Sequence, residues 1–154
     1  MCDATVAWRE DLGELVEELS QAGVAVEDVG VRKDLFRGFV ADAESRTDTM
    51  VDEVLGLLGP DEGTATQRLA VGGDELAEDW AYAREMVEDF PDREDAEPFV
   101  SRGTQLTNEV ERTGARWKTA LNEAAVLASP ELRKALVDEP SCTVIPRTAD
   151  TAQE

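Results

Sequence analysis

The sequence predicts an all-α protein, an up-down bundle of four main helices followed by a short fifth helix and an extended tail. Apolar residues recur in steps of three and four from near the start of the chain to about residue 138, which places them on one face of each helix. The joints at 59–63 and 91–97 are short, so consecutive helices are expected to fold back on one another.

Each helix is bounded by residues that start or stop helices. We expect main helices over about 4–22, 30–58, 64–90 and 98–128, and a short helix over 130–138. Gly59 and Pro60 close the second helix and Pro91 closes the third, because proline cannot continue a helix. Thr64 is the expected N-cap of the third helix, and Ser129 is expected to cap the fifth.

The apolar stripes repeat every ~3.5 residues, a spacing typical of helices that pack nearly parallel or antiparallel. The expected inward residues are Trp8, Leu12, Leu15 and Leu19; Phe36, Val40, Ala43, Thr47, Met50, Val54 and Leu57; Leu69, Gly73, Leu76, Trp80, Ala83, Val87 and Phe90; and Phe99, Gly103, Leu106, Val110, Thr113, Trp117, Ala120, Ala124 and Leu127. Three helices thus each contribute one tryptophan to the core.

Several of these inward positions carry small residues where a bundle normally has leucine or isoleucine. They are Thr47, Gly73, Gly103 and Thr113. Either tryptophans of neighbouring helices fill the space above them, or they mark the close approach of another subunit. The pair Gly72 and Gly73 also interrupts the third helix, with Asp74 placed to cap a restart.

The charge balance restricts the classes of function. Acidic residues outnumber basic ones 35 to 15, the formal net charge is -20, and histidine is absent. So few cations disfavour nucleic acid as a partner, because binding to phosphates depends on lysine and arginine. The absence of histidine removes the commonest general base and the commonest zinc ligand, and a ferritin-like di-iron centre, which needs histidine, is excluded.

The choice of charged residues indicates a salt-rich environment. Of the 15 basic residues only Lys33, Lys118 and Lys134 are lysines. This composition resembles that of proteins from organisms that keep molar salt in their cytoplasm, such as haloarchaea, and from their viruses. At about 1 M salt, charges are screened over roughly 3 Å, so the excess charge does not strain the fold. An ordinary acidic protein or a nucleic-acid mimic is the alternative.

The two cysteines, Cys2 and Cys142, lack the CxxC spacing of a zinc site and indicate no disulfide framework, so we expect a reducing compartment. No signal-peptide-like run occurs in residues 1–19, and no apolar run is long enough to cross a membrane. We therefore expect a cytoplasmic protein, or a virion protein if the source is viral, without membrane association.

Paired carboxylates are the one feature of the sequence that suggests catalysis. Asp11 with Glu14, and Glu75 with Glu78, are three residues apart, so each pair shares a helix face and offers oxygen ligands for magnesium. The stretches around them resemble the two acidic helices of the all-α nucleoside triphosphate pyrophosphohydrolases of the MazG type. The resemblance implies a magnesium-dependent enzyme with these four residues as ligands. With 35 acidic residues in the chain, a solvated acidic face is the alternative.

The segment 139–154 is expected to be a tail or arm, separate from the bundle domain at 1–138. Its apolar tetrad, Cys142, Thr143, Val144 and Ile145, lies between Pro140 and Pro146 and is too short to form structure alone. We expect the tetrad to bind a partner, or to pack as a strap on the protein's own bundle.

Together these features predict a non-catalytic interaction or assembly protein that binds a protein partner or forms a homo-oligomer, with no cofactor. A connector or other structural subunit of a tailed halophilic virus is one concrete version of this hypothesis. The magnesium-dependent pyrophosphohydrolase and an acidic regulatory protein are the alternatives.

Overall fold

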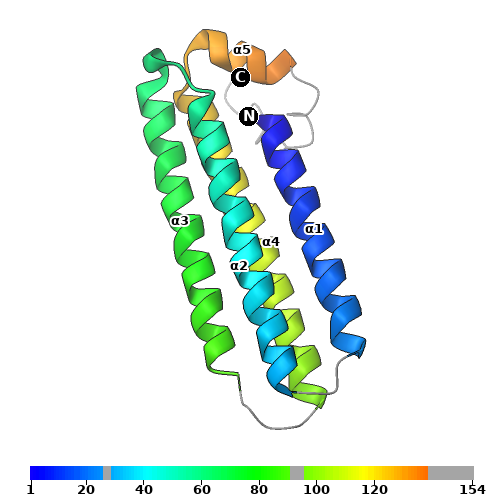
Figure 1. The fold of residues 1–154 in the computed structure, drawn as a ribbon. Helices are drawn as coiled ribbons and strands as arrows, with labels where there is room; N and C mark the ends of the chain where they lie inside the picture. Colours follow the sequence, from blue (N-terminus) through cyan, green and yellow to red (C-terminus); the bar gives the residue numbers. More distant parts are fainter. Residues whose placement is uncertain (26–28, 91–95, 139–154) are drawn as a thin grey trace, which may run out of the picture.

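A computed structural model describes residues 1–25, 29–90 and 96–138 of the chain (Figure 1). The helices are α1 (Cys2–Ala25), α2 (Val29–Gly56), the 3-10 turn η1 (Pro60–Glu62), α3 (Gly63–Glu88), α4 (Ala96–Leu127) and α5 (Pro130–Asp138). The expected all-α class and all five expected helices are confirmed, with ends that differ by at most three residues.

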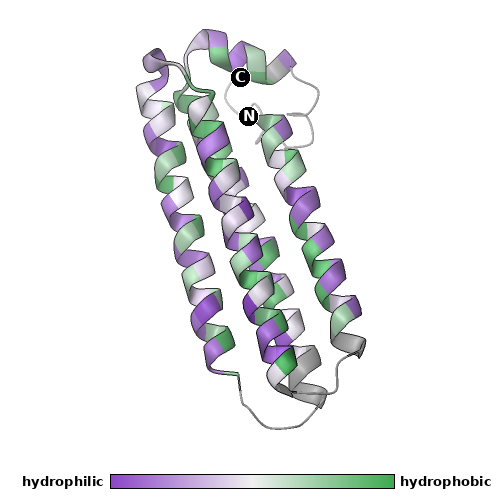
Figure 2. Ribbon diagram, in the orientation of Figure 1, coloured by the Kyte–Doolittle hydropathy of each residue, from purple (hydrophilic) through white to green (hydrophobic). Residues whose placement is uncertain are grey.

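The four long helices form an antiparallel bundle, and α5 lies across one end of it (Figure 1). α1 packs on α2, α2 on α3, and α3 on α4, while α4 also contacts α1 and closes the ring. The hydrophobic residues of each helix recur along one side, between hydrophilic residues (Figure 2). The core therefore runs along the axis between the four helices, as the apolar stripes predict.

Two details of α3 correct the expectations from sequence. The helix begins at Gly63 rather than after Thr64, and Glu62 occupies the N-cap position without a side-chain cap bond. The helix also continues unbroken through Gly72 and Gly73, so Asp74 caps no restart. Packing on both neighbouring helices stabilises this segment against the low helix propensity of glycine.

A hydrogen-bonded layer joins three helices inside the core. The indole Nε1 atoms of Trp8 and Trp80 both donate to the hydroxyl oxygen of Thr47, at 3.0 and 2.9 Å. The Thr47 hydroxyl in turn donates to the carbonyl oxygen of Ala43 at 2.7 Å. One threonine thus pairs the polar atoms of two buried tryptophans, which explains why a small polar residue occupies an inward position.

The third tryptophan makes an equivalent contact between α4 and α1. Trp117 Nε1 donates to the Thr5 hydroxyl at 3.1 Å, and both residues are buried. Thr113, another small inward residue, is fully buried and donates its hydroxyl to the carbonyl oxygen of Glu109 at 2.8 Å. Of the small inward residues, Thr47 is thus packed beside tryptophans of neighbouring helices, as the first of the two interpretations of the stripes expects.

The two adjacent glycines of α3 allow close approach of both neighbouring helices. A Cβ atom at Gly72 would lie 2.6 Å from Cβ of Ala120 on α4, and one at Gly73 would lie 2.7 Å from Cγ1 of Val51 on α2. Gly103, in contrast, has no atom within 4 Å of its Cβ position. Packing within the chain thus accounts for Gly72 and Gly73 but not for Gly103.

These distances predict opposite effects for two alanine substitutions. Gly72→Ala should lower the free energy of unfolding by about 1–3 kcal/mol, because its Cβ meets a backbone-anchored Cβ and the helices must separate. Gly38→Ala on α2 is the matched control, since its Cβ position has no neighbour within 4 Å, and it should raise stability by about 0.5–1 kcal/mol. Denaturant titration of both variants checks this, and a stabilising Gly72→Ala would contradict it.

Polar contacts hold the ends of the helices. The Ser129 hydroxyl accepts a hydrogen bond from Leu132 N at 3.1 Å, so Ser129 caps α5 as expected. Ser129 also donates through its backbone N at 2.9 Å, and through its hydroxyl, to the Glu62 carboxylate. These hydrogen bonds hold the pKa of the Glu62 carboxyl below its usual value. They tie the α4–α5 junction to the start of α3.

The opposite end is held by cations of α2. Arg37 donates to both Glu88 carboxylate oxygens at 2.7 Å, which lowers the pKa of the Glu88 carboxyl. Lys33 Nζ donates to the carbonyl oxygen of Glu88 at 2.8 Å. Cations at a helix C-terminus satisfy its unpaired carbonyl groups, so these two residues fix the end of α3 against α2.

Cys2, at the start of α1, is 4% exposed. The other cysteine, Cys142, lies with the rest of the expected arm, residues 139–154, outside the described residues.

Candidate functional site

The four carboxylates expected to bind magnesium do not form one cluster. Asp11 and Glu14 are on α1, and Glu75 and Glu78 are on α3, which lies diagonally across the bundle from α1 (Figure 1). Asp11 and Glu75 lie 3.6 and 3.8 Å from arginine nitrogens, whereas Glu14 and Glu78 are exposed. Within the part of the chain that the structure describes, no three potential ligands gather in a way that could hold a metal ion.

The other expected site, the tetrad Cys142, Thr143, Val144 and Ile145, lies outside the described residues.

A buried ion-pair cluster joins α3 to α4. The Asp79 carboxylate is 3% exposed and lies 3.0 Å from Arg112 Nη2 and 2.8 Å from Arg116 Nη1. Arg112 also pairs with Glu109 on its own helix and lies over the ring of Tyr82. Because its neighbours neutralise the Asp79 charge within the bundle, the cluster positions α4 against α3.

Asp79 is not among the predicted site residues, although Glu75 and Glu78, on either side of Leu76, are. Asp79 follows Leu76 by three residues and precedes Trp80, so it lies at the edge of the buried stripe. An acidic residue on the apolar face of an amphipathic helix was the available signal, because carboxylates in such positions are almost always paired.

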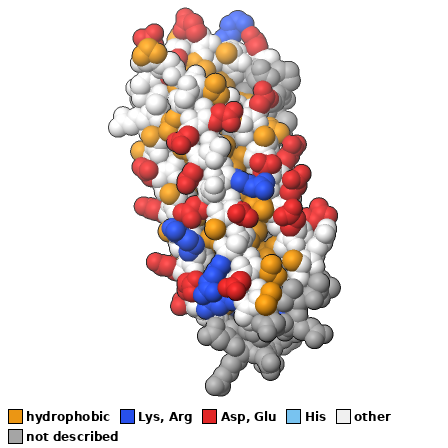
Figure 3. Space-filling model, in the orientation of Figure 1, with side chains coloured by type: hydrophobic (Ala, Val, Ile, Leu, Met, Phe, Trp, Pro, Cys, Tyr) orange, Lys and Arg blue, Asp and Glu red, His pale blue; other side chains and the backbone are white. Residues whose placement is uncertain are grey.

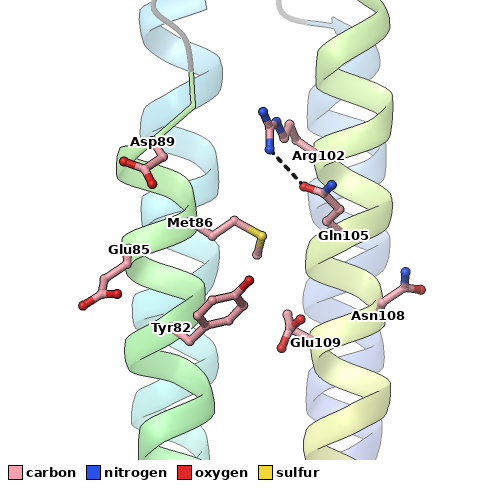
Figure 4. Close-up of a pocket in the computed structure, with 8 residues that line it drawn as sticks. All are labelled: Tyr82, Glu85, Met86, Asp89, Arg102, Gln105, Asn108 and Glu109. Carbon is pink, nitrogen blue, oxygen red and sulfur yellow. Dashed lines mark hydrogen bonds between the residues drawn. The ribbon is translucent and has the colours of Figure 1, made fainter.

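Next to this cluster, the surface between α3 and α4 contains an open hollow of about 420 Å³ (Figure 4). Tyr82 and Met86 of α3 reach toward α4, and Arg102 donates a hydrogen bond to Gln105 at 3.2 Å. Glu85 and Asn108 point away from the space between the helices (Figure 4). The polar groups around this hollow do not converge on a point where a substrate atom could react, so it has no catalytic arrangement.

A second hollow, of about 310 Å³, lies between α1 and α4 and is called the α1–α4 groove here. Trp8 and Leu12 of α1 and Val110 of α4 supply its apolar lining. Gly114 also lines it, and no described atom lies within 4 Å of the position that a Cβ would occupy there. The space above this glycine is open, so the groove can receive side chains from another surface.

The groove also differs in charge from the rest of the surface. Arg9 and Lys118 line it, one from each helix, together with the acidic Glu111. Other described cations contact carboxylates, an aromatic ring or backbone carbonyl groups, as in Arg37, Arg102 and Arg133. For Arg9 and Lys118, the described residues provide neither an ion pair nor a hydrogen bond.

Elsewhere acidic side chains dominate. They are spread along the whole length of the face in Figure 3, where lysine and arginine side chains are few. None of the helices in the described ranges combines the length and apolar content needed to cross a bilayer. The fold and the surface thus define an acidic antiparallel four-helix bundle with an open groove between its first and fourth helices.

No protein-family model, curated protein or solved structure significantly matches this chain.

Proposed function

We propose that this chain is a non-catalytic interaction and assembly protein that associates with a protein partner or with copies of itself. The supporting observation is the α1–α4 groove. Trp8 and Leu12 line it beside the open space above Gly114, and its two cations have no partner among the described residues. Trp8 and Leu12 are themselves 2% exposed, so the groove offers a partner mainly its open space and its two cations. Such a hollow is typical of a surface that binds another protein.

The protein would act in a salt-rich environment, in a halophile or its virus, where the repulsion caused by a net charge of -20 is screened. As the specific form of this assembly function, we propose a connector or other structural subunit of a tailed halophilic virus.

Light scattering coupled to size-exclusion chromatography at about 2 M salt, where charges more than ~3 Å apart are screened, tests this function. We expect a mass that is a multiple of 16.8 kDa and rises with protein concentration. A mass near 16.8 kDa at every concentration would contradict self-assembly.

A further inference from the structure

We propose that the occupant of the α1–α4 groove is the outer face of α3 from a second copy of this chain. This inference rests on the proposed function and names the two surfaces that make the contact. It follows from three observations: the lining of the groove, a complementary face elsewhere on the same chain, and the positions of the two surfaces in the bundle.

The face of α3 that points away from the core carries both apolar and acidic side chains. Val71 is 45% exposed, and Asp74, Glu78 and Glu85 are exposed near it. Tyr82 is 53% exposed, although it reaches toward α4 and its ring lies under Arg112. These five residues are called the α3 stripe. None of its three carboxylates has an ion-pair partner among the described residues. Residues at this spacing share one side of a helix, so the stripe is an amphipathic acidic surface.

The stripe and the groove complement each other in chemistry. The groove offers an open space above Gly114 lined by Arg9 and Lys118 and by one carboxylate, Glu111. The stripe offers Val71 and Tyr82 with carboxylates around them. The groove spans Val110 to Lys118, about 12 Å of helix, and the stripe spans Val71 to Glu85, about 21 Å. A helix laid in a groove between two helices contacts it over this length.

A second copy bound through its own groove fits less well. In a two-fold symmetric dimer of grooves, the same patch meets itself, so the two cations of each copy would have only one carboxylate of the other groove, Glu111, to pair with. Like charges across an interface oppose association. The groove therefore selects an acidic surface, and the same chain provides one.

The positions of the two surfaces determine the kind of assembly. The groove lies between α1 and α4, whereas the stripe lies on α3, the helix diagonal to α1. Each copy then offers its stripe to one neighbour and its groove to another. Such a head-to-tail contact builds rings when the rotation closes and filaments when it does not.

Two kinds of variant each disable one surface. Gly114→Leu fills the groove, and Lys118→Glu reverses its charge with a smaller change in volume. The double variant Val71→Lys/Glu78→Lys reverses the stripe at exposed positions. The matched controls on the outer face of α2 are Gly38→Leu, where no neighbour lies within 4 Å, and the exposed Asp42→Lys. Circular dichroism verifies that each variant retains its helices.

Light scattering at about 2 M salt then measures the mass of each protein. We expect the groove variants and the stripe variant to remain at 16.8 kDa when alone, and both controls to assemble like the unmodified protein. An equimolar mixture of Gly114→Leu and the stripe variant should form a complex of twice that mass, because one intact groove and one intact stripe remain.

Other outcomes overturn the proposal in distinguishable ways. If the unmodified chain assembles and the groove and stripe variants assemble equally well, the contact lies elsewhere, while the proposed function stands. If the mixture of the two variants stays monomeric, the contact is not head-to-tail. If the unmodified chain is monomeric at every concentration, self-assembly fails together with this interface.

Discussion

Thr47→Val is expected to destabilise the protein by about 2–5 kcal/mol. Valine has nearly the shape of threonine but accepts no hydrogen bond, so the Nε1 groups of Trp8 and Trp80 lose their acceptor at a site where Thr47 is 1% exposed. An unsatisfied buried donor costs roughly 1–3 kcal/mol, and this substitution leaves two. Denaturant titration followed by tryptophan fluorescence measures the loss.

Thr49→Val is the matched control for this prediction. Thr49 is on the same helix and its hydroxyl also donates to the carbonyl oxygen four residues earlier, at 2.9 Å, but the residue is exposed. We expect its stability to change by no more than about 0.5 kcal/mol. Thr47→Ser, which keeps the hydroxyl, should recover most of the loss. Equal effects of Thr47→Val and Thr49→Val would show that the shared hydrogen bonds contribute little.

Lowering the salt concentration from molar to about 0.05 M is expected to unfold the chain. The Debye length then exceeds ~10 Å, so the repulsion among 35 acidic residues of a 16.8 kDa domain is no longer screened. Circular dichroism across this range should show loss of helical signal, and restored salt should return it.

A variant with fewer charges separates repulsion from other salt effects. Glu10, Glu14 and Glu18 are exposed on α1, and changing all three to glutamine removes three negative charges without altering the core. The salt concentration at the unfolding midpoint should fall. An unchanged helical spectrum at low salt in the parent chain would refute the halophilic interpretation.

The arrangement of the helices could be predicted because one simple signal controls it. Apolar residues at steps of three and four determine which face is buried, and prolines and glycines delimit the helices. The same signal fails at the ends: Leu57 and Leu127 continue their stripes but are 59% and 48% exposed. α2 ends at Gly56 and α4 at Leu127, so these residues lie where the neighbouring helices no longer cover them.

The candidate site was harder to predict, because it depends on contacts between helices. The apolar pattern of the sequence predicts Trp8 and Leu12 as core residues, and the structure confirms their burial. The pattern does not indicate that a groove remains between α1 and α4. Nor does sequence show that Arg9 and Lys118 have no partner among the described residues while Arg112 and Arg116 meet Asp79. Charge pairing across helices depends on their relative rotation, which composition does not determine.

The three buried tryptophans, two of which share the Thr47 hydroxyl, give the protein an internal optical reporter. They lie on three different helices, α1, α3 and α4, and each is at most 2% exposed. Indole emission shifts to longer wavelength when water reaches the ring, so separation of any of these helices changes the colour of the intrinsic fluorescence without an attached dye. α5 contains no tryptophan, so its detachment alone should leave the emission nearly unchanged while the helical circular dichroism decreases.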